Sequence, residues 1–233
     1  MKKSTLRARL ASLRQIWFPP GTARYPLVAG VFGVSMYSLT QFNTGPLLNL
    51  PHHNLTLPID AWFPFLPWTV WIYVGCFPFW VISYILPCRY FEKRELVRFF
   101  AAEMLARLVG LLIFLVFPTT LVQPDISGLG PWDFMMKIVY AVDTPNDLFP
   151  SFHILTSWMC LIVVRGHKEI PRAWRIFATL FFVPICISVL TTRQHVLLDI
   201  VAAIPLAEIA WQITDRIGWT RVYGRLLGGV GRE

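Results

Sequence analysis

The sequence predicts an all-α integral membrane protein with six transmembrane helices and both termini in the cytoplasm. Of its 233 residues, 55% are hydrophobic. The apolar residues form long runs that are almost free of charge, as in helices that cross a bilayer. Basic residues gather in every second segment between these runs, as expected when alternate segments face the cytoplasm. The apolar runs and the distribution of basic residues are independent observations, and both indicate six membrane crossings.

Six apolar runs define the expected helices. They cover residues 25–40, 65–86, 99–117, 152–164, 174–190 and 196–217. A helix needs about 20 residues to cross the hydrocarbon, so the first run is short and the fourth is shorter still. The fourth gains length if it begins at Pro150 and if Arg165 and Lys168 extend to the far interface.

The basic residues give the orientation. The N-terminal segment holds six Lys and Arg, the connections after the second and fourth runs hold four each, and the C-terminal end holds four. The alternate connections hold only Lys137 and Arg193, and Arg107 lies within the third run. We therefore expect a basic cytoplasmic segment (1–24), a six-helix membrane domain (25–217) and a basic cytoplasmic tail (218–233).

Other protein classes are disfavoured by the same features. The net charge of +8 follows from loop charge, and no basic stripe or aromatic RNA motif suggests nucleic acid as a partner. The four cysteines lie in or at the end of apolar runs without C-x-x-C spacing, so neither a disulfide framework nor a zinc site is indicated. The basic N-terminus lacks the pattern of a cleavable signal peptide.

The long outward connection, residues 118–151, contains a partly apolar stretch at 132–140. This stretch is either a short helix lying at the membrane interface or an ordinary loop packed on the bundle. The sequence leaves both alternatives open.

The first segment that can carry chemistry is Asn146-Asp-Leu-Phe-Pro-Ser-Phe-His153, at the start of the fourth run. Proline and serine favour a helix start, where the serine side chain can cap free backbone N–H groups. A helix start attracts anions through those N–H groups and its dipole. His153 falls in the first turn, so this segment can hold an anion beside an imidazole.

The second segment is Thr191-Thr-Arg-Gln-His-Val-Leu-Leu-Asp199, which enters the sixth run. His195 and Asp199 are four apart and share a helix face. The carboxylate can accept the Nδ1–H of the imidazole, which leaves Nε2 free as a nucleophile or base. Arg193 has the planar shape that suits phosphate oxygens. Both segments fall at the extracytoplasmic end of the predicted bundle, so we expect the active site there.

Structural interpretations stand beside these functional ones. His195 and Asp199 alone fit a buried hydrogen-bonded pair. Glu103 and Arg107, four apart in the third run, are more typical of an intramembrane ion pair than of a substrate contact. The histidines at 52, 53, 153 and 195 lack a metal-ligand spacing, so no metal and no cofactor are expected.

The two segments resemble motifs of the type 2 phosphatidic acid phosphatase superfamily. Its second motif, P-S-G-H, is matched by Pro150-Ser-Phe-His153, with Phe152 in place of the glycine. The H-x3-D end of its third motif is matched by His195 and Asp199. Val189 stands where that motif has arginine, and the first motif, K-x6-R-P, is absent. F-P-S-x-H followed by T-(K/R)-Q-H-x3-D is most similar to the inositol-phosphorylceramide and sphingomyelin synthase-like branch.

The resemblance implies residue roles. His195 attacks phosphorus and becomes a phosphohistidine, Asp199 orients it, and His153 protonates the leaving oxygen. Ser151 and Arg193 hold the phosphate oxygens. Supporting roles fall to Arg107, Asn146 and Glu103.

The function implied is hydrolysis of a lipid phosphate or pyrophosphate at the outer face of a plasma or inner membrane, facing the periplasm, exterior or lumen. One alternative is transfer of a phospholipid or sphingolipid head group to an alcohol or a second lipid. A second alternative is a non-catalytic lipid-binding or transport protein on the same scaffold.

Overall fold

The structure is a computed structural model that describes residues 15–48 and 50–227. Within these residues the fold is all-helical, with two isolated bridges and no strand. The helices are α2 (Arg24–Leu48), α3 (Val70–Tyr90), α4 (Lys93–Val116), α5 (Pro131–Val142), α6 (Phe152–Val164), α7 (Arg172–Thr191), α8 (Leu197–Ile213) and α9 (Trp219–Leu226), with short 3-10 turns η1 (Pro58–Trp62) and η2 (Pro67–Thr69).

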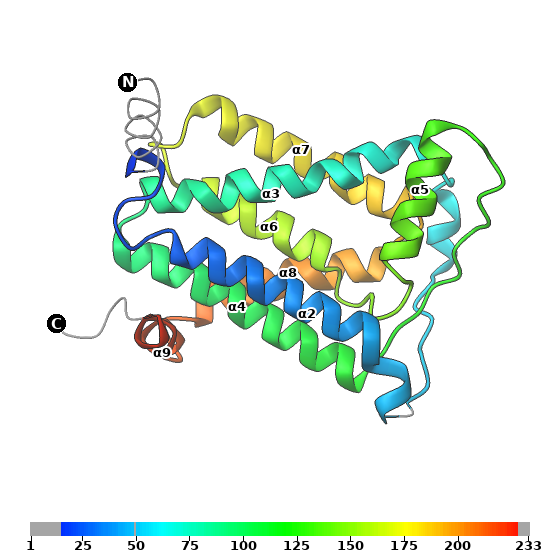
Figure 1. Cartoon of the computed structure of the whole chain (residues 1–233), viewed down its shortest axis with the longest axis horizontal. Helices are drawn as coiled ribbons and strands as arrows, with labels where there is room; N and C mark the ends of the chain where they lie inside the picture. The colour runs from blue at the N-terminus through cyan, green and yellow to red at the C-terminus, as the bar shows by residue number, and fades with distance from the viewer. Residues whose placement is uncertain (1–14, 49, 228–233) are drawn as a thin grey trace, which may run out of the picture.

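Successive long helices run in opposite directions. Figure 1 shows α2, α3, α4, α6, α7 and α8 side by side, with the starts of α6 and α8 at the end of the bundle that carries α5. The start of α2 and the C-terminal α9 lie at the opposite end (Figure 1). Both motif segments are therefore far from the two ends of the described chain, at one end of an antiparallel bundle.

Among the described residues, three segments are long and apolar enough to cross a membrane, judged by length and composition: Pro67–Tyr90, Lys93–Val116 and Arg172–Thr191. Two of the other predicted spans are shorter than these segments. α6 has 13 residues and α8 has 17, and at 1.5 Å per residue α6 is only about 20 Å long. Six crossings, and the side on which each end lies, remain predictions.

The predicted helix boundaries differ from the observed ones in four helices. α3 begins at Val70 and ends at Tyr90, five and four residues after its predicted start and end. α2 continues to Leu48, beyond the predicted end at residue 40. α4 begins at Lys93, six residues before the predicted start, because its charged first turns remain helical outside the apolar run. The helix predicted from the sixth run, α8, ends at Ile213, before the predicted end at residue 217. The chain then turns at Gly218, whose φ of 73° is left-handed.

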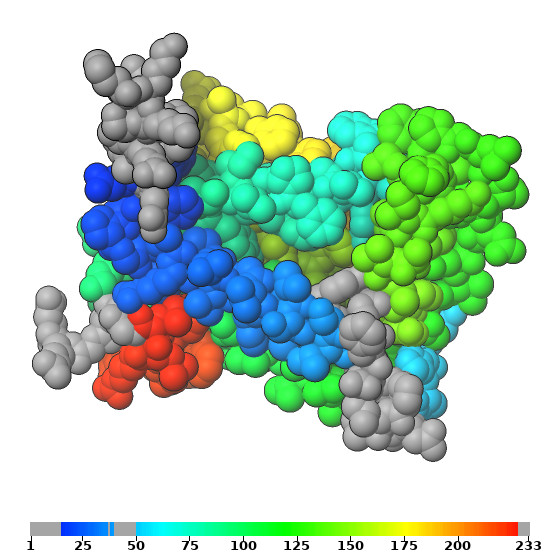
Figure 2. All heavy atoms as spheres, viewed as in Figure 1, coloured from blue at the N-terminus to red at the C-terminus, as the bar shows by residue number. Residues whose placement is uncertain are grey.

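α6 forms the centre of the bundle. It packs against α3, α4, α7 and α8, and nine of its 13 residues are buried. In the space-filling view α6 lies at the bottom of a hollow between α2 and α3 (Figure 2). A helix enclosed by other helices need not match the hydrocarbon thickness, which accounts for its short length.

The aromatic residue in the second motif is accommodated by a glycine. A Cβ atom placed on Gly110 of α4 would lie 2.3 Å from the Phe152 Cε1 atom, so only glycine leaves room for this ring. Phe114, one turn further along α4, also contacts this ring, with centroids 4.8 Å apart. Phe152 therefore occupies a notch in α4 and fixes the first turn of α6 against it.

The predicted C-terminal tail includes an ordered helix. The Trp219 indole at the start of α9 donates to the Ala101 carbonyl at 2.9 Å, and Tyr223 is buried against Tyr25 and the core. Burial raises the pKa of the Tyr223 phenol above its ordinary value, so its hydroxyl stays neutral. Residues 219–226 thus pack on the membrane bundle.

The glycine notch predicts a matched pair of substitutions. Gly110→Ala should destabilise the protein by about 1–3 kcal/mol, because the methyl group displaces Phe152. Gly75→Ala is the control, since its Cβ would meet Phe181 at an ordinary 3.6 Å, and it should be neutral or stabilising. Thermal unfolding in detergent measures both. Gly110→Ala on a Phe152→Ala background should lose most of its penalty, and equal penalties on both backgrounds would contradict the notch.

The predicted topology can be tested with two single cysteines. Leu129→Cys lies in the loop before α5, where Leu129 is 96% exposed, and Arg225→Cys lies on the exposed side of α9. In intact cells an impermeant thiol reagent should label position 129 and spare position 225 until the membrane is permeabilised. The unsubstituted protein gives the background from the four native cysteines. Labelling of both positions in intact cells would refute opposite sides.

Candidate active site

Ser151 begins α6 and links the two motifs. Its Oγ accepts the Ile154 N–H at 3.3 Å, as an N-cap does. Its own N–H donates to the Asp199 carbonyl at 3.2 Å. The side chain is fully buried. One residue therefore caps α6 and ties that helix start to the first turn of α8.

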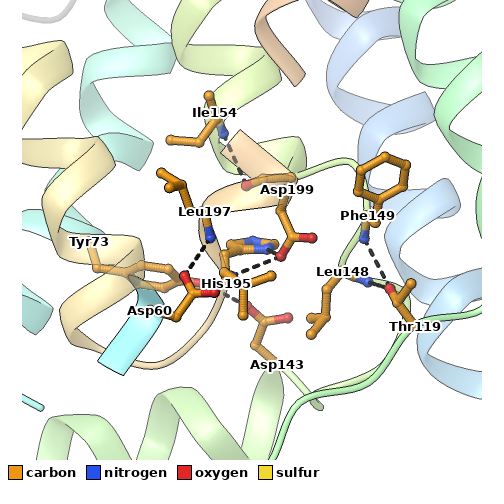
Figure 3. Close-up of polar contacts among 12 residues, drawn as sticks. Asp60, Tyr73, Thr119, Asp143, Leu148, Phe149, Ile154, His195, Leu197 and Asp199 are labelled. Atoms are coloured by element: carbon orange, nitrogen blue, oxygen red, sulfur yellow. Dashed lines mark hydrogen bonds and ion pairs between the residues drawn. The ribbon is translucent and has the colours of Figure 1, made fainter. Parts of the chain in front are cut away.

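Asp199 holds the first turn of α8 and the imidazole of His195. Its Oδ2 accepts the Val196 N–H at 3.0 Å and lies 3.1 Å from His195 Nδ1. Figure 3 shows the carboxylate directed at the ring. The contact expected from the four-residue spacing is thus present. When Nδ1 carries the proton, it donates to Asp199 and His195 presents an unprotonated Nε2.

His153 lies against His195 where the two helix starts meet. The ring centroids are 5.7 Å apart in an edge-to-face arrangement. His153 Nε2 is buried, and within residues 15–48 and 50–227 no hydrogen-bond partner reaches it. A buried imidazole nitrogen without a partner is costly unless another polar group supplies one. Two imidazoles thus lie together, and one of them has a ring nitrogen that can take a further hydrogen bond.

The His153 ring is held by aromatic side chains of α3. Tyr73, Trp80 and Phe77 lie 4.5, 5.4 and 6.1 Å from it between centroids. The Trp80 indole also donates to Ser157 Oγ at 2.9 Å, and Ser157 donates to the His153 carbonyl at 2.7 Å. These contacts restrict the ring to one orientation.

Arg193 adopts a left-handed backbone conformation, with φ of 53°. Its Nη1 donates to the Asp60 carbonyl at 3.1 Å and its Nη2 to the Phe63 carbonyl at 2.8 Å. Two of the five N–H donors of the guanidinium are thus used to fasten η1 to the turn before α8. A role in binding phosphate would rest on the remaining donors.

Asp60 is a site-forming residue that the sequence analysis did not identify. Its Oδ1 accepts the Leu197 N–H at 2.8 Å and its Oδ2 accepts the Leu57 N–H at 2.7 Å (Figure 3). The carboxylate is 2% exposed and caps α8 from a distant part of the chain. The only feature of the sequence that could have indicated Asp60 is the presence of an acidic residue in an otherwise apolar stretch. Together, Asp60 and Arg193 hold the turn that carries His195.

Thr119 orders the loop before α6. Its Oγ1 accepts the N–H groups of Leu148 and Phe149 at 2.8 and 3.1 Å, and its carbonyl accepts the Asp147 N–H at 2.8 Å. Asn146 lies in the same loop, and its backbone forms an isolated antiparallel β-bridge with Thr120. The loop that carries Asn146 is thus tied to residues 119 and 120 through backbone contacts.

The turn between α7 and α8 is fastened to neighbouring elements. The Tyr140 hydroxyl of α5 donates to the Thr192 carbonyl at 2.7 Å. The hydroxyls of Thr69 and Thr191 lie 2.9 Å apart. Burial raises the pKa of Tyr140, opposed in part by the nearby charge of Arg193. The phenol thus remains a neutral donor, and the turn is held from two sides.

Val189 occupies the position where the third motif has arginine. It is fully buried, and its carbonyl accepts the N–H groups of Gln194 and His195 at 3.1 and 3.0 Å. No guanidinium can enter the site from this position. The basic group that the motif places here is missing from this chain.

Glu103 and Arg107 form a separate cluster within the bundle. Arg107 Nε pairs with the Glu103 carboxylate, which also accepts the Tyr84 hydroxyl at 3.1 Å. Arg107 Nη2 donates to Thr156 Oγ1 at 2.9 Å, one turn beyond His153 on α6. The ion pair expected from the spacing is present, and through Thr156 it joins α4 to α6.

The four-histidine arrangement finds no support among the described residues. No three His, Cys, Asp or Glu side chains there are placed to hold a metal ion. His53 lies in the segment between α2 and η1, with its ring stacked on Phe117 at 4.4 Å between centroids.

Comparison with known proteins identifies the family. A family model described as the PAP2 superfamily matches residues 52–213, which include both motifs and helices α3 to α8. Neither the curated proteins nor the solved structures gave a match to this chain. Members of this superfamily are phosphatases or phosphotransferases, and the long apolar helices fit an integral membrane protein. Because the family match covers more than half of its length, the chain belongs to the PAP2 superfamily.

Proposed function

We propose that this protein is a membrane lipid phosphatase that hydrolyses a lipid phosphate or pyrophosphate through a phosphohistidine intermediate at the extracytoplasmic face. The observation that carries the proposal is the pairing of His195 Nδ1 with Asp199 Oδ2 at 3.1 Å, with the His153 ring facing His195. This arrangement presents one imidazole as a nucleophile and another as an acid. The superfamily supports phosphoryl chemistry in general terms.

In the first half-reaction, His195 Nε2 attacks phosphorus and the bond from phosphorus to the leaving oxygen breaks. The leaving oxygen takes a proton from His153, whose Nε2 has no partner among the described residues. Asp199 stabilises the positive charge that develops on His195. The lipid alcohol departs, and the phosphoryl group stays on His195.

In the second half-reaction, water attacks the phosphohistidine. His153, now neutral, takes the proton from the attacking water, and the bond from His195 to phosphorus breaks. The products are inorganic phosphate, neutral His195 and protonated His153, so the cycle closes. Ser151, at the start of α6, lies where helix-start N–H groups can stabilise the phosphate oxygens.

Transfer of a lipid head group to an alcohol or second lipid is the second candidate. Two observations favour it. The K-x6-R-P motif is absent from the sequence. Moreover, His195 and Asp199 are only 7% and 1% exposed, which restricts the access of water to the pair. A panel of lipid phosphates, assayed with and without alcohol acceptors, separates free phosphate from new lipid products. Lipid binding without turnover of any member would favour a non-catalytic role.

The covalent route predicts a trapped intermediate. After brief reaction with labelled lipid phosphate and an alkaline quench, acid-labile label should be found on His195 by mass spectrometry. Asp199→Asn should fold normally and lower turnover about 100-fold or more, because the imidazole loses its orientation and proper tautomer. His195→Ala should abolish both label and turnover. Label on His153 would reverse the two roles, and inversion of configuration at phosphorus would indicate direct attack by water.

The role of Arg193 can be separated from its structural contacts. If Arg193 also binds phosphate, Arg193→Ala should weaken inhibition by inorganic phosphate at least tenfold, and Arg193→Lys should weaken it less. Asp60→Asn is the control, because it disturbs the same turn without removing the cation. It should lower thermal stability and leave the inhibition constant for phosphate nearly unchanged. Equal inhibition constants for both variants would assign Arg193 a structural role alone.

A further inference from the structure

Helix α5 lies at the site end of the bundle and carries an uncovered apolar stripe. Figure 1 shows α5 running across the direction of the long helices. Phe134, Ile138 and Val142 are four residues apart, so they share one face. They are 65%, 48% and 62% exposed. On the opposite side Met136 is fully buried, so the helix is packed on the protein by one face only.

The elements that α5 packs against also expose apolar side chains. Both η2 and α3 contact α5. Trp68 in η2 and Trp71 at the start of α3 are 46% and 50% exposed. α3 with η2 is one of the segments long and apolar enough to cross a membrane. Tryptophans at the end of such a segment are typical of the membrane interface. The stripe on α5 therefore belongs to a helix that packs beside an apolar segment suited to lipid.

We propose that α5 is an interfacial helix whose stripe of Phe134, Ile138 and Val142 is embedded in the lipid layer beside the active site. The length and amphipathic character of α5 fit a helix lying in the plane of the interface. An exposed stripe of this size on a water-facing loop would be unusual. Lipid is the partner selected by the contact of α5 with η2 and α3, which together form a candidate membrane span. This inference concerns membrane contact and holds whether the site hydrolyses or transfers phosphate.

The buried side of α5 touches both halves of the active site. Tyr140 donates to the Thr192 carbonyl, three residues before His195. Asp143, directly after the helix, accepts the Tyr73 hydroxyl at 2.5 Å, and the Tyr73 ring lies 4.5 Å from that of His153. Insertion of the stripe into lipid would thus set the placement of the two histidines. Tyr140 is a positioning residue in this scheme, because it acts through the turn that carries His195.

Depth-dependent fluorescence quenching tests the insertion without relying on activity. Phe134→Cys and Ile138→Cys, labelled with an environment-sensitive fluorophore in nanodiscs, should be quenched severalfold more by lipids carrying a nitroxide on the upper acyl chain than by aqueous iodide. Asp125→Cys, exposed in the loop before α5, is the matched control and should show the reverse. The unsubstituted protein gives the background labelling. Quenching at 134 and 138 equal to that at 125 would overturn the proposal.

The coupling is tested by activity in two settings. Phe134→Ser with Ile138→Ser should lower turnover of a long-chain lipid phosphate in nanodiscs severalfold, while turnover of a short-chain, water-soluble phosphate in detergent stays unchanged. Tyr140→Phe should keep the quenching at position 138 and lower kcat for both substrates. Normal kinetics for Tyr140→Phe would remove the link from α5 to His195. A wild-type protein without turnover would refute the proposed function, while the quenching result would still decide insertion.

Discussion

The site depends on the hydrogen bond from the Ser151 N–H to the Asp199 carbonyl, which joins the starts of α6 and α8 at 3.2 Å. The two residues are 48 positions apart and belong to different motifs. Each also satisfies its own helix start, Ser151 as the cap of α6 and Asp199 through the Val196 N–H. Because free N–H groups at buried helix starts are costly, both contacts resist rearrangement. The positions of His153 and His195 follow from this junction.

The junction is supported by contacts from other elements. Asp60 caps α8 from η1, and Arg193 fastens η1 to the turn before that helix. Thr119 orders the loop that leads into α6. These residues act on backbone groups and leave the facing imidazoles free of direct contact with them. The two helix starts are thus held in place by hydrogen bonds between buried side chains and backbone groups.

The absence of arginine at position 189 changes how charge is arranged around the site. The two arginines closest to the motif segments both have structural partners: Arg193 contacts carbonyls of η1, and Arg107 pairs with Glu103 and Thr156. If the proposed function holds, anion binding would rest more on the helix start at Ser151 than on free guanidinium groups. The bilayer would then help to position a lipid substrate through its acyl chains.

The sequence by itself determined the helical class, the helix positions within a few residues and the contact of His195 with Asp199. Each of these depends on local periodicity or on a four-residue spacing, and such properties are encoded in neighbouring residues. Asp60, Thr119 and the notch at Gly110 could not be predicted, because their partners lie 137, 29 and 42 positions away in sequence. The use of Arg193 as a clamp on η1 was likewise decided by the tertiary structure. Only packing of the bundle brings such distant groups within hydrogen-bonding or van der Waals distance.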